Sequence, residues 1–264
     1  MGEIDVAGAE KIGHAFVDAR RSGATLTDYP GTIPETLAEA YAAQDAAIAK
    51  WGEPVGGWKV GRIPLHLEAQ YGSNRLAGPI FAPSIVEATD ASLAMPVFEG
   101  FAAAEAEFML RIGTAPAPGK SDYTIEQAAE LIDAVHAGIE IASSPFPGIN
   151  AHGPAVTVSD FGNNYGLIIG PEVADWREAV TQWTLSVAIN GEVIATGQGA
   201  NMLDGPVGAA AFLFNLMARR GIALTPGQWI STGAVTGVHE VNVGDTVEAL
   251  FDGGHSVRCT IAAF

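Results

Sequence analysis

A change of hydrophobic pattern at Gly52 constrains the fold of this chain more than any other feature. Before Gly52 apolar residues recur at helical spacing, and after it short apolar runs are separated by Gly and Pro, which is typical of strands. Residues 4–21 are expected to form an amphipathic helix. Thr32 and Glu35 have the spacing of a capping box and predict the start of a second helix that extends to Gly52. Residues 1–52 are therefore expected to form a helical N-terminal region.

The chain beyond Gly52 contains a series of strand-like runs. Between two of them lies the pair Asn190-Gly191, which is a strong sequence signal for a tight β-hairpin. The expected strands are 55–60, 79–86, 104–112, 137–142, 184–189, 192–196, 229–232, 246–251 and 256–261.

Two helices interrupt this series of strands. Thr124 and Gln127 have capping-box spacing and predict a helix that extends through Val135, and Asp204 begins another that ends at Gly221. This order of elements indicates an α+β protein dominated by mixed or antiparallel sheet. A length of 264 residues with 48% hydrophobic content is expected to give a single compact domain over the whole chain.

Composition limits the partners and the location of the protein. Acidic residues outnumber basic ones by 30 to 13, so a net charge of −17 repels nucleic acid and anionic membranes, and neither is expected as a partner. The first twenty residues lack a leader pattern and no later stretch is long enough to span a bilayer, which predicts a cytoplasmic protein. Cys259 is the only cysteine, which excludes an internal disulfide and a thiolate-rich metal site.

Three glutamates in strand-like runs are candidate metal ligands. The period of two of a strand places Glu105 and Glu107 on one face of the run 104–110, where their charges repel unless water, a proton or a cation relieves them. Glu140 is a lone carboxylate in the apolar run 137–142, where burial requires a partner. Three oxygen ligands suit Mg²⁺ or Mn²⁺ better than zinc. The alternative is a solvent-facing strand edge, with Glu140 paired to an arginine.

Lys59 is a candidate catalytic residue. It is one of only four lysines, and an aromatic residue and glycines flank it in Gly57-Trp58-Lys59-Val60-Gly61. In a partly apolar pocket its ammonium group could pair with a substrate carboxylate or, with a lowered pKa, transfer a proton. An exposed lysine at a sheet edge is the alternative.

Two loop segments offer polar groups to a ligand. Thr232 and Gly233 follow an expected strand, and their hydroxyl and backbone N–H groups could bind a carboxylate. Asn163 and Asn164 lie in a second Gly-containing segment with the same potential. A plain turn is the alternative for both segments.

Together these segments resemble the 2-keto-4-pentenoate hydratase branch of the fumarylacetoacetase superfamily, which also includes 4-oxalocrotonate decarboxylases. The similarity covers most of the chain, and the order and spacing of its pieces are specific. It rests on the helical N-terminal region, Gly57-Trp58-Lys59-Val60-Gly61, Glu105-Ala106-Glu107, Ile139-Glu140-Ile141, and the stretch from Ser231-Thr232-Gly233 through Gly244-Asp245-Thr246.

The resemblance implies a fumarylacetoacetase-type mixed β-sheet roll, a homo-oligomer and a small 2-oxo acid substrate. It also implies that Glu105, Glu107 and Glu140 ligate Mg²⁺ or Mn²⁺, and that Lys59 is catalytic. The substrate-binding residues that it implies are Lys59, Ser143, Thr232 and Gly233.

Three segments depart from the family pattern and concern the substrate more than the reaction class. Where relatives often carry Asp-Ser-Arg, this chain has Ser143-Ser144-Pro145. Where they carry Asp-Asn-Ala-Ser, it has Asp160-Phe161-Gly162-Asn163. The acidic segment that relatives carry near Gly78-Pro79-Ile80 is missing from this chain.

The predicted function is metal-dependent addition of water to a 2-hydroxy-2,4-dienoate, which gives a 4-hydroxy-2-oxo acid in the catabolism of aromatic compounds. One alternative is a 2-oxo-3-hexenedioate decarboxylase, with Arg62 and Arg75 as the receptor for a second carboxylate. Another is an acylpyruvate C–C hydrolase in which His66 and Glu68 activate water, although both could be helix-surface residues. The last is a non-catalytic homologue that binds metal or ligand.

Overall fold

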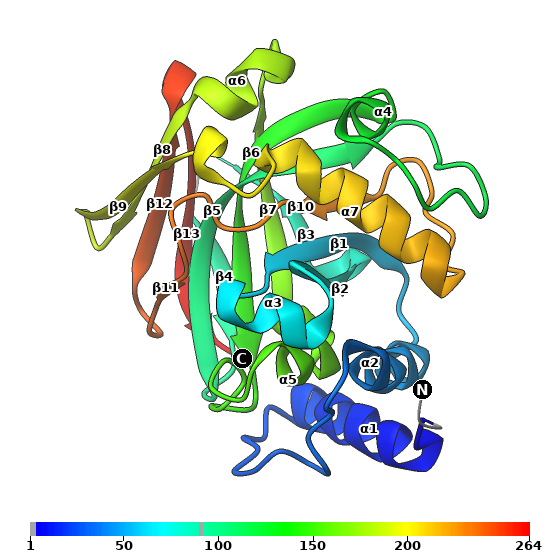
Figure 1. Ribbon diagram of the computed structural model, residues 1–264. Helices are drawn as coiled ribbons and strands as arrows, with labels where there is room; N and C mark the ends of the chain where they lie inside the picture. Colours follow the sequence, from blue (N-terminus) through cyan, green and yellow to red (C-terminus); the bar gives the residue numbers. More distant parts are fainter. Residues whose placement is uncertain (1–3, 90–91) are drawn as a thin grey trace.

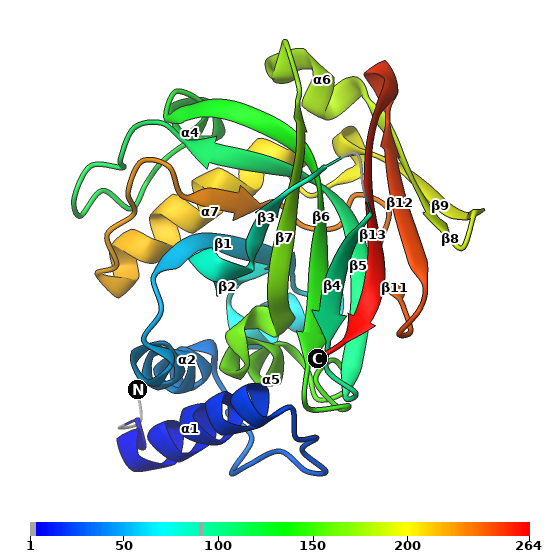
Figure 2. The same ribbon diagram turned by 180° about the vertical axis from the view of Figure 1, so that it is seen from behind.

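The computed structural model describes residues 4–89 and 92–264, and it shows curled sheets with helices packed around them (Figure 1). Helices α1 and α2 lie side by side at one end of the molecule in both views (Figures 1 and 2). Within the described residues, no helix combines the length and the hydropathy that a membrane crossing requires. The helices are α1 (Val6–Ser22), α2 (Leu37–Trp51), α3 (Leu65–Tyr71), α4 (Ile125–Ala129), α5 (Pro154–Ser159), α6 (Trp176–Gln182) and α7 (Gly205–Arg220).

The strands form two sheets, and both are mixed. The first has the spatial order β2 (Arg75–Phe81), β1 (Val55–Arg62), β10 (Trp229–Ser231), β5 (Phe101–Ile112), β6 (Ile132–Ser144), β7 (Asn164–Glu172) and β3 (Ile85–Glu87), and β11 (His239–Glu240) also pairs with β5. The second has the order β4 (Leu93–Val97), β13 (His255–Ala263), β12 (Thr246–Phe251), β8 (Thr184–Ile189) and β9 (Glu192–Gln198). The pairs β1–β10, β3–β7 and β4–β13 are parallel, and the others are antiparallel. The predicted α+β fold with mixed sheet is confirmed.

The two faces of β5 have different surroundings, as the period of two predicts. The even-numbered side chains from Ala104 to Leu110 belong to the main hydrophobic core, which also takes residues from β12, β13 and α7. Glu105 and Glu107 lie on the opposite face of the strand, and so does Met109, which packs in a separate cluster with Leu167. The first sheet therefore has one apolar face that packs on the rest of the protein and one face that carries charge.

Helix α2 begins later than predicted. Its N-cap is Thr36, whose Oγ1 accepts a hydrogen bond from the Glu39 backbone N–H at 3.2 Å, while the Glu39 carboxylate accepts one from the Thr36 N–H at 3.2 Å. The predicted start at Thr32 is wrong, because an identically spaced Thr-x-x-Glu box four residues further along is the one that forms. Helices α1 and α2 both end where the sequence predicts, each at a glycine with positive φ.

Two other boundaries differ from the prediction. The helix predicted through Val135 is wrong beyond Ala129, because Ile132 begins β6 and cross-strand pairing with β5 overrides the helical spacing. The strand expected over 79–86 is divided, since the 3-10 turn Ala82–Ser84 with its proline separates β2 from β3. Strands β4, β7 and β11 were not predicted at all.

The hairpin between β8 and β9 forms where the sequence predicts it. Asn190 has a φ of 53° and Gly191 a φ of 83°, which is the left-handed conformation that both central residues of a type I′ turn require. The hairpin forms the outer edge of the second sheet.

Candidate metal centre

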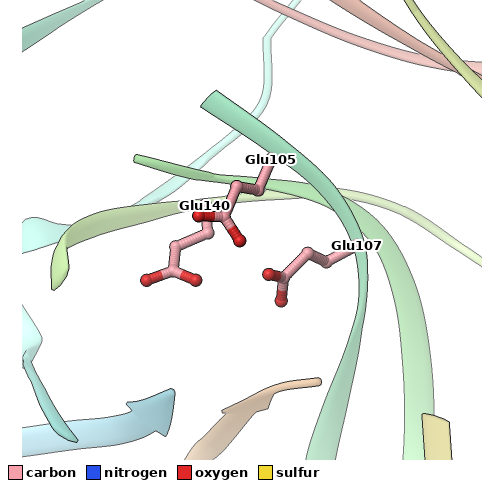
Figure 3. Close-up of side chains that lie close together, drawn as sticks. All are labelled: Glu105, Glu107 and Glu140. Atoms are coloured by element: carbon pink, nitrogen blue, oxygen red, sulfur yellow. The ribbon is translucent and has the colours of Figure 1, made fainter. Parts of the chain in front are cut away.

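Three glutamate side chains converge on one point of the charged face of the first sheet (Figure 3). Glu105 and Glu107 extend from β5 and Glu140 from the neighbouring β6, where Glu105 and Glu140 are directly opposite in the ladder. Each side chain offers an oxygen such that all three oxygens lie within 4.8 Å of one another. Glu105 is 5% exposed and the other two are fully buried, so the alternative of a solvent-facing strand edge is wrong.

The glutamates share a single basic partner among the described residues. Lys59 on β1 places its Nζ 3.1 Å from Glu140 Oε1, and it is itself buried. Three carboxylates and one ammonium group leave an excess of two negative charges when all are ionised. Burial, opposed by Lys59 and reinforced by Glu140, raises the pKa of Glu105 to about 7. Burial and the other two carboxylates raise the pKa of Glu107 well above its ordinary value.

Lys59 is charged in this environment. Burial by itself lowers the pKa of Lys59, but the attraction of Glu140, Glu105 and Glu107 outweighs it and raises the pKa above the ordinary value. The suggestion that Lys59 has a lowered pKa is therefore wrong for the ion-free site. Glu140 is therefore paired with Lys59, and not with an arginine as the alternative interpretation expected.

Hydrogen bonds orient two of the carboxylates but leave one oxygen without a donor. Asn164 Nδ2 donates to Glu140 Oε1 at 2.8 Å, and the Gly233 backbone N–H donates to Glu107 Oε2 at 3.0 Å. The Ser231 hydroxyl lies between Glu107 and Glu140 and contacts an Oε2 atom of each. Glu107 Oε1 is buried and has no hydrogen-bond partner in the described residues. A buried carboxylate oxygen without a donor is unfavourable, so this oxygen is free to ligate a cation.

The donor set fits a divalent cation of the hard type. It consists of carboxylate oxygens, and its excess of two negative charges equals the charge of such an ion. Mg²⁺, Mn²⁺ and Ca²⁺ favour oxygen ligands, whereas zinc and copper sites commonly include histidine or cysteine. Cys259, the only cysteine of the sequence, is buried in the main hydrophobic core on β13 of the second sheet and is not part of this centre.

A cavity of about 700 Å³ opens beside the glutamates. Glu105, Lys59, Thr232 and Gly233 line it, so three of the four predicted substrate-binding residues lie at one cavity together with a candidate metal ligand. The Thr232 hydroxyl donates to the Phe108 carbonyl at 2.9 Å, which leaves its oxygen lone pairs for a ligand. These residues come from β1, β5 and the segment after β10, which are neighbours in the sheet.

The structure does not bring Ser143 to this cavity. Its Oγ donates to the Phe101 carbonyl at 2.7 Å and accepts from the Phe98 backbone N–H at 2.9 Å. Ser143 is fully buried and ties the start of β5 to the end of β6. Its hydroxyl is therefore committed to the backbone.

Two of the remaining candidates line the cavity and one binds a glutamate of the centre. Asn163 lines the cavity, whereas Asn164 binds Glu140. His66 on α3 also lines the cavity and is exposed, but within the described residues no hydrogen bond joins it to Glu68. The acid–base pair that the sequence suggested is thus not formed.

Sequence reasoning missed a second buried charged group near the centre. Arg20 of α1 pairs with Asp160, with Nη2 3.0 Å from Oδ2, and its Nη1 donates to the Asn164 carbonyl at 3.0 Å. Asn164 in turn binds Glu140, so Arg20 supports a residue of the metal centre from outside it. The signal that could have found it is a basic residue one turn after Phe16 on the buried stripe of α1.

Comparison with known proteins agrees with this fold. Residues 78–262 match the family model described as fumarylacetoacetate (FAA) hydrolase, C-terminal. A 4-oxalocrotonate decarboxylase of Pseudomonas sp. strain CF600 is 29% identical over 97% of this chain and 94% of its own length. A 2-keto-4-pentenoate hydratase of Burkholderia vietnamiensis is 30% identical over 92% of this chain and 93% of its own. The solved structure of a 4-oxalocrotonate decarboxylase from Pseudomonas putida G7, complexed with magnesium and adipate, has a TM-score of 0.82 at 21% identity and covers 99% of this chain and 100% of that one.

The fold and the centre define an enzyme class in which a curled mixed sheet holds a divalent metal between buried carboxylates. The chain belongs to the fumarylacetoacetate hydrolase family, so the predicted family and roll-type fold are confirmed. Its relatives include both hydratases and decarboxylases at nearly equal identity.

Proposed function

We propose that this protein is a metal-dependent hydratase that converts a 2-hydroxy-2,4-dienoate into a 4-hydroxy-2-oxo acid. The observation that carries the proposal is the buried group of Glu105, Glu107 and Glu140, which has excess negative charge and one carboxylate oxygen without a donor in the described residues, beside a cavity that Glu105 and Lys59 line. The chain's similarity over most of its length to a 2-keto-4-pentenoate hydratase supports the same reaction.

The three glutamates would hold Mg²⁺ or Mn²⁺, and Lys59 would act on the substrate beside them. A bound divalent cation supplies Lewis-acid polarisation of the 2-oxo group of such a substrate. Lys59 carries a positive charge at the cavity wall, so it is suited to pair with the substrate carboxylate. Thr232 and Gly233 form the wall next to it and are proposed to contact the same carboxylate end.

The overall reaction adds one water molecule and needs no further reactant. For 2-hydroxypenta-2,4-dienoate, the enol oxygen loses its proton and C5 gains one, which gives the conjugated 2-oxo-3-enoate. Water then adds across C3 and C4, so that its oxygen bonds to C4, C3 gains a proton and the second proton of the water is kept in the new hydroxyl group. The cavity lining also includes neutral hydrogen-bonding groups, namely Asn150, Thr157, Asn163 and Asn201. Neutral donors and acceptors are suited to hold water and an uncharged substrate end.

A second candidate function, decarboxylation of a 2-oxo-3-hexenedioate, is favoured by two arginines. Arg62 and Arg75 are cross-strand partners on β1 and β2, and both line the cavity, where they could receive a second carboxylate. Arg75 is, however, already bound to Asp204 and to the Leu203 carbonyl. Arg62 is exposed and has no such partner among residues 4–89 and 92–264, so one of the two arginines is available to a second carboxylate and the other is already paired.

An ultraviolet assay tests the proposal and separates the two reactions. The parent protein and Glu107→Gln are given enzymatically generated 2-hydroxypenta-2,4-dienoate and, separately, a 2-oxo-3-hexenedioate, with Mg²⁺ or Mn²⁺ and with EDTA. We expect metal-dependent loss of diene absorbance only for the monocarboxylate, with 4-hydroxy-2-oxopentanoate found by mass spectrometry and activity lost in the variant. Release of CO₂ from the hexenedioate without hydration of the dienoate would replace the hydratase by the decarboxylase.

Two other properties remain proposals. We propose that the protein works in the cytoplasm and as a homo-oligomer, as the sequence and its resemblance suggested. Size-exclusion chromatography with light scattering measures the second directly, and a monomeric mass at micromolar concentration would contradict it.

A further inference from the structure

A strained turn between α5 and β7 forms part of the cavity wall. Phe161, Gly162 and Asn163 follow one another with φ values of 53°, 66° and 63°, all in the left-handed region. Glycine adopts this region freely, but a residue with a side chain incurs roughly 1–2 kcal/mol there. Strain of this kind persists only where the surroundings fix it, and it is concentrated at functional sites.

Contacts outside the metal centre hold the turn in place. The backbone N–H of Asn163 donates to the Asp160 carbonyl at 2.8 Å, and the Asp160 side chain is bound by Arg20. Phe161 packs edge-on against Trp51 and Phe81, with ring centroids 5.9 and 5.0 Å apart. The conformation of the turn is therefore imposed by the fold and not by the glutamates.

The turn is packed tightly against the strands that carry the site. A Cβ atom added to Gly78 on β2 would lie 2.1 Å from the Phe161 carbonyl oxygen, so no side chain can be accommodated there. A Cβ atom added to Gly162 would lie 3.2 Å from Cδ of Lys59. The turn thus lies along the stem of Lys59, and the side chain that it contributes to the cavity is Asn163.

The amide of Asn163 is buried but unsatisfied. The residue is 3% exposed, and its Oδ1 has no hydrogen-bond partner in the described residues. The neighbouring Asn164, by contrast, donates to Glu140. A buried carbonyl oxygen without a donor is unfavourable, and a ligand with an O–H group at this point would satisfy it.

We propose that Asn163 recognises the hydroxyl group of the 4-hydroxy-2-oxo acid, with its side-chain carbonyl accepting a hydrogen bond from that O–H. The inference rests on the proposed function, because only that reaction gives the ligand a 4-hydroxyl. It makes Asn163 a specificity-determining residue, and it gives the strained turn a role, which is to hold one amide in the cavity beside Lys59.

Binding of two ligands that differ by this hydroxyl tests the inference without relying on turnover. Isothermal titration of the Mn²⁺-loaded protein compares 4-hydroxy-2-oxopentanoate with 2-oxopentanoate, for the parent and for Asn163→Gly, which removes the amide and tolerates the positive φ. The parent is expected to prefer the hydroxylated ligand by roughly tenfold, the size of one hydrogen bond, and the variant to lose that preference. Affinity for 2-oxopentanoate should change by less than about twofold. Retained preference, or equal weakening of both ligands, would overturn the inference.

A second variant separates the amide oxygen from the shape of the turn. Asn163→Asp keeps an acceptor and is tolerated in the left-handed region, so the preference for the hydroxylated ligand is expected to persist. A loss as large as in Asn163→Gly would assign the effect to the turn and contradict the role of the oxygen. If the Mn²⁺-loaded parent binds neither 2-oxo acid, both proposals fail. If it prefers the hydroxylated ligand but hydrates no dienoate, only the proposed function fails.

Discussion

Two groups of buried charges lie close together in this protein and are built on opposite principles. The first, the arginine cluster, consists of Arg20, Asp160 and Ser144. Arg20 and Asp160 neutralise each other, the Ser144 hydroxyl donates to Asp160 at 2.6 Å, and the guanidinium also donates to three backbone carbonyls. Every charge in this cluster has a partner of opposite sign.

The second group, the glutamate centre, consists of Glu105, Glu107, Glu140 and Lys59. It has one positive charge for three negative ones, and Glu107 Oε1 has no donor in the part of the chain that the structure describes. Burying excess charge is unfavourable unless a proton or an ion neutralises it. The balanced arginine cluster therefore stabilises the fold, whereas the glutamate centre needs a proton or a cation to neutralise its excess negative charge.

Removing a charge from the balanced cluster should have the largest effect on stability. Arg20→Met leaves Asp160 buried and unpaired, which should lower the free energy of unfolding by about 3–5 kcal/mol. Urea denaturation in EDTA measures the change. The matched control is Arg111→Met, which breaks an exposed pair with Asp133 and should cost at most about 1 kcal/mol. Equal small losses in the two variants would show that the cluster does not stabilise the fold.

Removing the positive charge of the glutamate centre should lower turnover, whereas the change in the arginine cluster lowers stability. Lys59→Met is expected to lower kcat on the 2-hydroxydienoate by ~10²-fold or more, because it removes the charged group that we place at the substrate. Steady-state assays at saturating Mg²⁺ measure the loss, and circular dichroism checks the fold. Lys120→Met, in the segment before α4 and not among the residues that line the cavity, is the control and should keep parental kcat. Undiminished turnover in Lys59→Met would remove this residue from the mechanism.

The sequence could predict the glutamate centre but not the arginine cluster. The period of two in β5 and the lone carboxylate in β6 follow from local pattern, so the three glutamates and their strands could be identified from the sequence. The partner of Arg20 is 140 positions away, and nothing local to α1 indicates Asp160. Balanced clusters of this kind depend on tertiary packing, which a single sequence does not reveal.

Conformation also limited what the sequence could predict at the cavity. Phe161 is an unfavourable residue for the left-handed region, so the turn that places Asn163 could not be inferred from turn propensities. Ser143 lies on the strand that carries Glu140, and the family resemblance implied that it contacts the substrate. Its hydroxyl is instead taken by the backbone of Phe98 and Phe101, which the sequence does not place beside it.

A smaller effect is expected from the hydroxyl that bridges two glutamates. Ser231→Ala removes the contacts to Glu107 and Glu140 but no candidate ligand, so Mn²⁺ affinity should fall by about 10–100-fold. Competition with a fluorescent chelator measures the affinity, and Ser22→Ala at the exposed end of α1 is the control. An unchanged Mn²⁺ affinity in Ser231→Ala would mean that the serine does not orient the glutamates.

The smallest expected effect is a dependence of stability on pH. The pKa of Glu105 is raised from 4.5 to about 7 in the ion-free fold, so its contribution to stability is complete below pH 4.5 and is lost as the pH rises through 7. The Tm in EDTA should therefore fall between pH 5.5 and 8. The rise in Tm that Mg²⁺ causes should grow over the same range, because the cation binds the deprotonated carboxylate. Differential scanning fluorimetry measures both, and a Mg²⁺ effect that is constant with pH would contradict this account.

The central claim is that the excess charge of the glutamate centre is completed by a divalent cation, and direct titration of Mn²⁺ tests it. Isothermal titration calorimetry at pH 7.5 compares the parent, Glu107→Gln, and the control Glu130→Gln at an exposed position. We predict one Mn²⁺ per chain in the parent and the control, and a loss of affinity of at least ~100-fold in Glu107→Gln. Absence of Mn²⁺ binding in the parent, or equal affinity in all three proteins, would contradict the claim.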